Sequence, residues 1–235
     1  MNRKQFLEAL SEGIRNFSGV VFKEGINLSG VELINRNLSR SRFYRTKLPK
    51  AALDDVWLND AELIECDMVG ASLSCARLQR TNLTGSNLSG AYMKYANLSE
   101  ANLTRVNLTK AKLMYANLYL ANLSDVILIG GNLIHASLMH AKLTDACLSD
   151  IYLRNTIGNG AEIITLTLMG HTIVLCIPTR TVWVGCQSGT PEYWLGLTEE
   201  QSREIGILGG DVGMEFYKKE LDFLKLFIKM RFGLK

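Results

Sequence analysis

Large apolar side chains recur at every fifth position of this chain from Leu28 to Leu153. The row has 26 consecutive units, and leucine fills it everywhere except at Phe43, Met68 and Met93. A period of five fits neither an amphipathic helix, whose period is 3.6 residues, nor a strand, whose period is 2. The pattern therefore predicts a repeat architecture, in which each short unit buries its apolar side only by stacking on its neighbours.

A second row of mostly small residues lies two positions before the first row. Alanine is common in it, as at Ala96 and Ala101, and Cys66 falls in the same row, whereas Arg36 is an exception. We expect both rows to point inward and the other three residues of each unit to point outward. The predicted core stack in the middle of the repeat comprises Leu83, Leu88, Met93, Leu98, Leu103, Leu108 and Leu113.

The segment 96–105 reads Ala-Asn-Leu-Ser-Glu-Ala-Asn-Leu-Thr-Arg. It resembles the pentapeptide-repeat family, whose unit is Ala-Asp/Asn-Leu-x-x, and the likeness extends over residues 16–155. The resemblance implies a mainly β fold, a right-handed quadrilateral β-helix with about four units and about 20 residues in each coil. At a strand spacing of ~4.8 Å, a β-helix of about 6.5 coils would be about 30 Å long.

Charged residues offer a test of the 20-residue coil, because stacked side chains must then stand 20 positions apart. One such column reads Arg40, Asp60, Arg80 and Glu100, with signs that alternate. We interpret these residues as ion pairs between coils, each worth roughly 0.2–1 kcal/mol, rather than as separate basic and acidic blocks suited to nucleic acid or its mimicry. Further partners at this spacing are Arg42 with Glu62, Arg45 with Glu65, Lys47 with Asp67, Arg105 with Asp125, and Trp57 with Arg77.

The residues before the repeat predict an N-terminal capping helix within residues 1–15. Helical spacing relates Phe6, Leu7, Leu10 and Ile14, and the polar side of this helix is mixed in charge, which favours a cap over a membrane-surface helix. Residues 16–155 would form the β-helix itself. The step from Phe22 to Leu28 is six residues instead of five, which predicts one inserted residue in the first coil.

Residues 156–235 predict a small C-terminal α+β module, a hairpin with a third strand followed by two helices. Alternating β-branched residues predict strands at 161–168, 171–177 and 181–186. A capping box at 198–201 predicts one helix, and apolar residues at helical spacing predict another over 211–231. The run Val184-Gly185-Cys186-Gln187 with Trp194 resembles a C-terminal module of some phage and prophage pentapeptide proteins.

Charge and cysteine content indicate which partners and which cellular compartment to expect. The 235 residues carry a net charge of +3, which is too small to indicate nucleic acid binding. Five cysteines without a Cys-x-x-Cys motif favour free thiols in a reducing compartment, so we expect a cytoplasmic protein. The start does not resemble a signal peptide, and no apolar run approaches the ~18 residues of a membrane span. Secretion without a signal peptide stays open.

Catalytic and metal-binding motifs are not found in the sequence. His135 and His140 are five positions apart, and neither they nor His171 stand at the spacing of metal ligands. No phosphate-binding loop, nucleotide fingerprint or nucleophile elbow occurs, and the pair Asp54-Asp55 has no nearby base. We therefore expect no enzyme activity, no metal, no cofactor and no small-molecule substrate.

The outward positions of the later coils are unusually apolar. At 20-residue stacking, Tyr95, Tyr115 and His135 form one column, and Met114 and Ile134 form another beside it. Such a patch usually marks a contact surface, and its occupant would be the C-terminal module, a second copy in a homodimer, or a foreign protein. The candidate interaction patch comprises Tyr92, Tyr95, Met114, Tyr115, Tyr119, Leu120, Ile134, His135, Met139 and His140.

These features predict a non-catalytic scaffold that forms a homodimer and modulates a cellular or host protein through the β-helix surface and the C-terminal module. The family resemblance suggests an alternative, a DNA mimic that binds DNA gyrase or topoisomerase. Mimicry requires an acidic surface, whereas residues 26–155 carry 14 Lys and Arg against 11 Asp and Glu, which disfavours it. A translocated bacterial effector is a further alternative.

Overall fold

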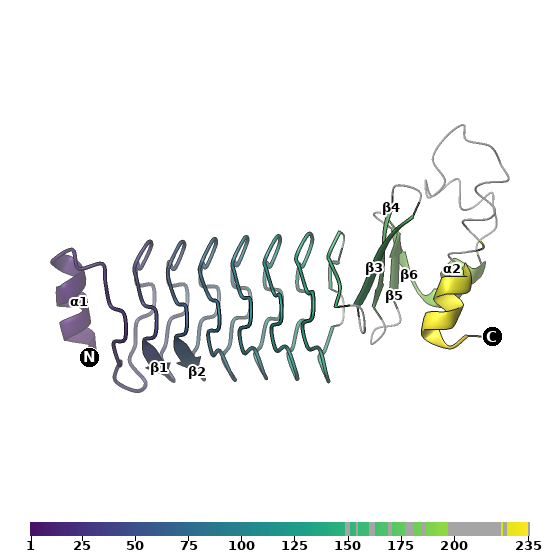
Figure 1. Ribbon diagram of the computed structural model, residues 1–235. Helices are drawn as coiled ribbons and strands as arrows, with labels where there is room; N and C mark the ends of the chain where they lie inside the picture. The colour runs from purple at the N-terminus through teal and green to yellow at the C-terminus, as the bar shows by residue number, and fades with distance from the viewer. Residues whose placement is uncertain are drawn as a thin grey trace. The chain divides into compact units, whose positions relative to one another are not determined.

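The computed structural model divides into two compact units, Met1–Tyr152 and Leu153–Lys235, and each unit is described by itself. In Figure 1 the first unit runs from purple to teal, and the second contains the green strands and the yellow helix. The residues described are 1–148, 151–153, 155–159, 163–168, 171–176, 181–184, 187–196, 222 and 225–234.

Residues 20 positions apart lie side by side in the first unit, which confirms the predicted coil. Parallel bridges join Asn97 to Asn117 and Asn117 to Ser137, and each coil forms one rung of the stack in Figure 1. Two short strands, β1 (Arg42–Tyr44) and β2 (Glu62–Ile64), pair in parallel at the same spacing. Four five-residue units therefore complete each coil.

The first coil contains the predicted extra residue. Asn16 pairs with Asn37 and Val21 with Arg42, both 21 positions apart, whereas Asn27 pairs with Lys47 at 20. The insertion thus lies between residues 21 and 27, where the apolar row takes its six-residue step.

Both predicted inward rows are buried. The core stack Leu83, Leu88, Met93, Leu98, Leu103, Leu108 and Leu113 is at most 1% exposed throughout. The small residues two positions earlier fill the space between successive large ones, as Ala96 and Ala101 show with 0% and 1% exposure. Burial of a large side chain contributes about 2 kcal/mol, so the repeat gains its stability from the stack.

Most of the described units end in a tight turn at the second residue after the leucine. At Lys50 the φ angle is +55°, and the Ala51 amide donates to the Leu48 carbonyl at 3.1 Å. This is the geometry of a type II turn, which also accepts proline at its second position, here Pro49. Asparagine before the leucine supports the turn, since Asn97 Oδ1 accepts the backbone amide two residues on at 3.1 Å.

The turn bond from the Cys66 amide to the Leu63 carbonyl is missing, and hydrogen bonds to a buried side chain of the next coil replace it. The Cys66 amide donates to Ser86 Oγ at 2.9 Å, and Ser86 Oγ donates to the Leu63 carbonyl at 2.6 Å. One coil earlier, the Cys66 thiol donates to the Phe43 carbonyl at 3.6 Å. Burial raises the pKa of this thiol to about 12, so Cys66 is a neutral core residue at physiological pH.

Replacement of Ser86 by alanine is expected to lower the free energy of unfolding by about 1–3 kcal/mol, although alanine is common in this row. The buried Cys66 amide would be left without an acceptor, which carries the desolvation penalty of an unpaired donor. Urea denaturation measures the change. Ser41→Ala is the control. The Ser41 hydroxyl donates to the Leu38 carbonyl, and that carbonyl also accepts the Ser41 amide, so the substitution leaves no backbone group unpaired. Equal effects of both substitutions would contradict the assigned role of Ser86.

The N-terminal helix α1 spans Arg3–Ser11. Asn2 and Gln5 form its capping box, and Phe6 is fully buried with its ring edge-on to Phe17 and Phe22, at 4.8 and 4.9 Å between centroids. The helix is shorter than the predicted capping helix of residues 1–15. Gly13 at φ +81° follows it and stops the helical backbone, leaving Ile14 exposed.

The second unit contains a four-stranded antiparallel sheet in the order β3-β4-β5-β6. The predicted hairpin is present, since Leu168 pairs with His171. A short helix α2 (Pro191–Gly196) follows, and its buried Trp194 donates from Nε1 to the Val182 carbonyl at 3.0 Å. The strands are β3 (Ile163–Leu168), β4 (His171–Cys176), β5 (Thr181–Val184) and β6 (Gln187–Gly189).

Several sequence predictions for this unit extend outside the described residues. The predicted third strand is present as β5 over Thr181–Val184, and its predicted residues 185 and 186 are not among those described. β6 and α2 were not predicted, because Gln187–Gly189 has no apolar alternation and six residues are too few for a helical period. The helix predicted at 198–201 lies outside the described residues. Of the helix predicted over 211–231, residues 222 and 225–232 are helical.

Candidate protein-interaction surface

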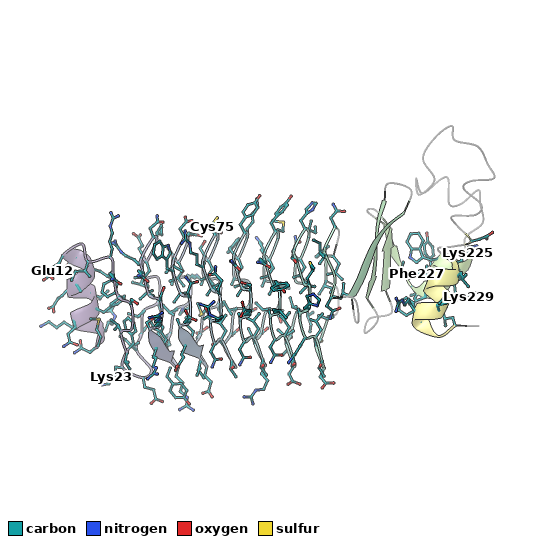
Figure 2. The ribbon with its side chains drawn as sticks, in the orientation of Figure 1. Glu12, Lys23, Cys75, Lys225, Phe227 and Lys229 are labelled. Carbon is teal, nitrogen blue, oxygen red and sulfur yellow. The ribbon has the colours of Figure 1, made fainter. Side chains whose placement is uncertain are left out.

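Two outer faces of the coils carry the candidate patch. Face A consists of residues 32–35, 52–55, 72–75, 92–95, 112–115 and 132–135, one segment from each coil. Face B consists of residues 37–40, 57–60, 77–80, 97–100, 117–120 and 137–140. Figure 2 shows the side chains projecting outward from successive coils, with Cys75 labelled on face A.

Aromatic rings form the predicted column on face A. Tyr95 and Tyr115 stack with centroids 5.0 Å apart, and Tyr115 and His135 stack at 4.6 Å with an angle of 9° between the rings. Tyr95 and Tyr115 are 52% and 43% exposed. Because the rings cover one another's faces, the column presents ring edges and phenol hydroxyls to a partner. The ring edges are partly positive, and the hydroxyls donate hydrogen bonds.

Two lysines that were not included in the predicted patch hold these rings. Lys112 Nζ lies 4.2 Å from the centroid of Tyr92, and Lys94 Nζ lies 4.9 Å from that of Tyr95 and 5.8 Å from that of Tyr115. Each cation–π contact contributes roughly 0.5–1 kcal/mol at an exposed site. The signal was in the sequence, because Lys112 stands 20 residues after Tyr92.

Face B continues the apolar surface. Leu120 is 47% exposed, Met139 is 42% exposed, and Tyr119 meets His140 edge-on with centroids 5.7 Å apart. Exposed large apolar side chains next to one another favour contact with another apolar surface. Two members of the predicted patch, Met114 and Ile134 on face A, are only half-buried rather than exposed and contribute less surface.

The earlier coils carry the predicted ion pairs in part. Arg45 Nε lies 2.9 Å from Glu65, Arg42 lies 3.3 Å from Glu62, and the Arg77 guanidinium lies 4.7 Å from the Trp57 ring centroid. These exposed contacts contribute little each, and they pair some of the charges of the early coils with one another.

In the column of alternating charge, Asp60 pairs with Arg80 and not with Arg40. Arg80 binds the carboxylate with Nε at 2.7 Å and Nη2 at 3.1 Å, and these bonds lower the pKa of Asp60. The other three predicted pairs do not form within residues 1–148: Lys47 lies outside ion-pair distance of Asp67, Arg80 of Glu100, and Arg105 of Asp125. Asp67 instead accepts a backbone amide in its own turn.

The described residues contain no group of three potential metal ligands, and none of their helices has the length and apolar composition needed to cross a membrane. His135 and His140 lie on neighbouring faces, each beside a tyrosine ring. Exposed apolar and aromatic side chains with lysines beside the rings are a composition that is common at protein contact surfaces.

Comparison with known proteins agrees with the coil geometry. A family model described as pentapeptide repeats matches eight copies, over residues 26–63, 53–90, 81–118 and 116–155. The chain belongs to the pentapeptide repeat family, whose fold is a right-handed β-helix. No curated protein matches the chain.

Solved structures of the same family are similar to this chain. HetL, a protein of heterocyst differentiation regulation from the cyanobacterium Nostoc sp. strain PCC 7120, is 24% identical over 68% of this chain and 98% of its own, with a TM-score of 0.32. A thylakoid-lumen protein of Arabidopsis thaliana is 32% identical over 42% and 72%, with a TM-score of 0.34. QnrB1, a plasmid-mediated fluoroquinolone resistance protein, is 20% identical over 59% and 75%, with a TM-score of 0.31.

Proposed function

We propose that this protein is a non-catalytic scaffold that modulates a cellular or host protein by binding it, with face B as the principal contact surface. The observation that supports the proposal is the exposure of large apolar side chains on this face in the last coils, at Tyr119, Leu120 and Met139. Such residues lower the free energy of a complex when a partner covers them. The same positions in the earlier coils hold polar or charged residues, for example Ser99 and Glu100.

The C-terminal unit is proposed to contribute to the same function, either by adding contacts to the partner or by selecting it. We further propose a cytoplasmic location, on the basis of free thiols at Cys66, Cys75 and Cys147. Mimicry of DNA receives no support from the surface, because Lys94 and Lys112 lie within the aromatic part of face A, where a DNA mimic would need acidic groups.

Affinity capture with the tagged full chain tests the proposal. Leu120→Glu and Met139→Glu are expected to lower the affinity for the captured and then purified partner by about tenfold or more, because each places a carboxylate in an apolar contact. Ser99→Glu is the matched control, since residue 99 stands in the column of Met139 two coils earlier. Glutamate is compatible with the turn at Leu120, because Glu100 holds the same position at φ +60°. Unchanged affinity in both variants would refute face B as the contact surface.

A further inference from the structure

Face A changes its chemistry along the β-helix. Its first coils are acidic, with Glu32, Asp54 and Asp55, and its later coils are basic and aromatic, with Lys94 and Lys112 beside the tyrosines. Between them, one coil presents only small side chains, Ser72, Ser74 and Cys75. Face A thus has an acidic half and a basic half, separated by one coil of small side chains. Two antiparallel copies with this arrangement have complementary charges.

We infer that face A binds face A of a second copy, with the two β-helices antiparallel and a two-fold axis through the coil of residues 72–75. An axis along the strand direction reverses the order of the coils but keeps each column opposite itself. The coil of Met93 then faces the coil of Leu53 of the other copy, and the coil of Leu113 faces that of Leu33.

This register brings opposite charges together in the same columns. Lys94 lies opposite Asp54, and Lys112 lies opposite Glu32, each pair occurring twice by symmetry. Ile34, which is 45% exposed, lies opposite Met114. The two lysines already stand on tyrosine rings, so their ammonium groups are held at the surface that the second copy would cover.

Other registers match less well. With the axis one coil later, Lys94 would face Lys94 of the other copy, and like charges in a contact repel. With the axis half a coil later, Lys94 and Lys112 would face Ser74 and Ala52 instead of carboxylates. The coil of residues 72–75 at the centre also allows the two faces to approach closely, because its outward side chains are short.

The proposed contact covers five coils, a length of about 20 Å at ~4.8 Å per coil. Interfaces of this size lie below about 1,200 Å² and are weak, so we expect a dissociation constant in the micromolar range. The proposal deepens the proposed function, since it assigns face A to self-association and leaves face B to the foreign partner.

A charge-swap experiment on the purified full chain, by sedimentation velocity across the micromolar range, tests the register. Glu32→Lys and Lys112→Glu alter exposed residues, and each is expected to weaken the dimer by about tenfold or more, because each creates two like-charge contacts. An equimolar mixture of the two variants is expected to dimerise like the unaltered protein. In the mixed dimer the introduced lysine of one variant meets the introduced glutamate of the other, and the second contact pairs the unaltered Lys112 with the unaltered Glu32. Asp54 is not altered, because its carboxylate accepts hydrogen bonds from the Ser72 hydroxyl and the Ser74 amide of the next coil.

The control is Lys142→Glu, an equal change of charge at an exposed residue outside face A, which is expected to leave the dimer intact. A bismaleimide is expected to link two copies through Cys75, which is exposed and close to the axis, and Cys75→Ser is expected to abolish the linked product. A monomeric unaltered protein, single variants that dimerise normally, or a mixture that stays monomeric would each overturn the proposal. Because no partner is present in this experiment, its failure is distinct from a failure of face B to bind one.

Discussion

Leu103→Lys is expected to lower the free energy of unfolding by at least about 4 kcal/mol and to prevent the β-helix from folding as one cooperative unit. Leu103 is fully buried, with Leu83 and Leu123 above and below it in the same column. The substitution removes a packed apolar side chain and places an ammonium group where no acceptor or counter-charge is available. Urea denaturation followed by circular dichroism measures the effect.

Asn102→Lys is the control for this prediction, because it adds the same side chain at the adjacent position. Asn102 points outward and is half-buried, and the equivalent residue two coils later is Lys142. Loss of the bonds that Asn102 Oδ1 accepts from Thr104 is expected to lower the free energy of unfolding by only about 1 kcal/mol. Equal stability of the two variants would show that the leucine row is not the core.

Phe6→Ala is expected to lower the free energy of unfolding by about 3–4 kcal/mol. The Phe6 ring is 0% exposed and is the one buried side chain of α1, in edge contact with Phe17 and Phe22. Its removal leaves a cavity and frees the helix from the first coil, whose Phe22 ring in turn stacks on Phe43. Differential scanning calorimetry of the full chain measures the change.

Lys4→Ala is the matched substitution on the same helix. The Lys4 side chain is 86% exposed and its one ion pair, to Glu8, is 3.7 Å long, so its loss is expected to change the stability by less than about 0.5 kcal/mol. A destabilisation by Phe6→Ala no larger than that by Lys4→Ala would mean that α1 does not stabilise the open end of the β-helix.

The sequence predicted the neighbours of most side chains in the first unit, because a period of five with four units per coil places residues i and i+20 in contact. The column Tyr95, Tyr115 and His135 and the cation–π pair of Trp57 with Arg77 follow from this arithmetic alone. The candidate patch was therefore predictable as a set of columns. The exposure of its members was less predictable, since Met114 and Ile134 are half-buried.

The arithmetic of the repeat does not choose between two equally spaced partners. Asp60 stands one coil from Arg40 and one coil from Arg80, and only the side-chain geometry gives it to Arg80. The hydrogen bond from the Cys66 amide to Ser86 also depends on local geometry that the repeat does not specify. It replaces the turn bond to the Leu63 carbonyl, which is absent next to strand β2, and no residue pattern in the sequence marks that absence.

By itself, then, the sequence determined the five-residue unit and its inward rows, because one large and one small residue in every unit must be buried by stacking. The 20-residue coil came from the family resemblance, and the charges spaced 20 residues apart supported it. The tertiary structure decided the features that depend on local competition. These are the end of α1 at Ser11, the choice of ion pairs and the fourth strand β6. Alternative exposed ion pairs differ in free energy by about 1 kcal/mol or less, which is too little to leave a periodic signal in the sequence.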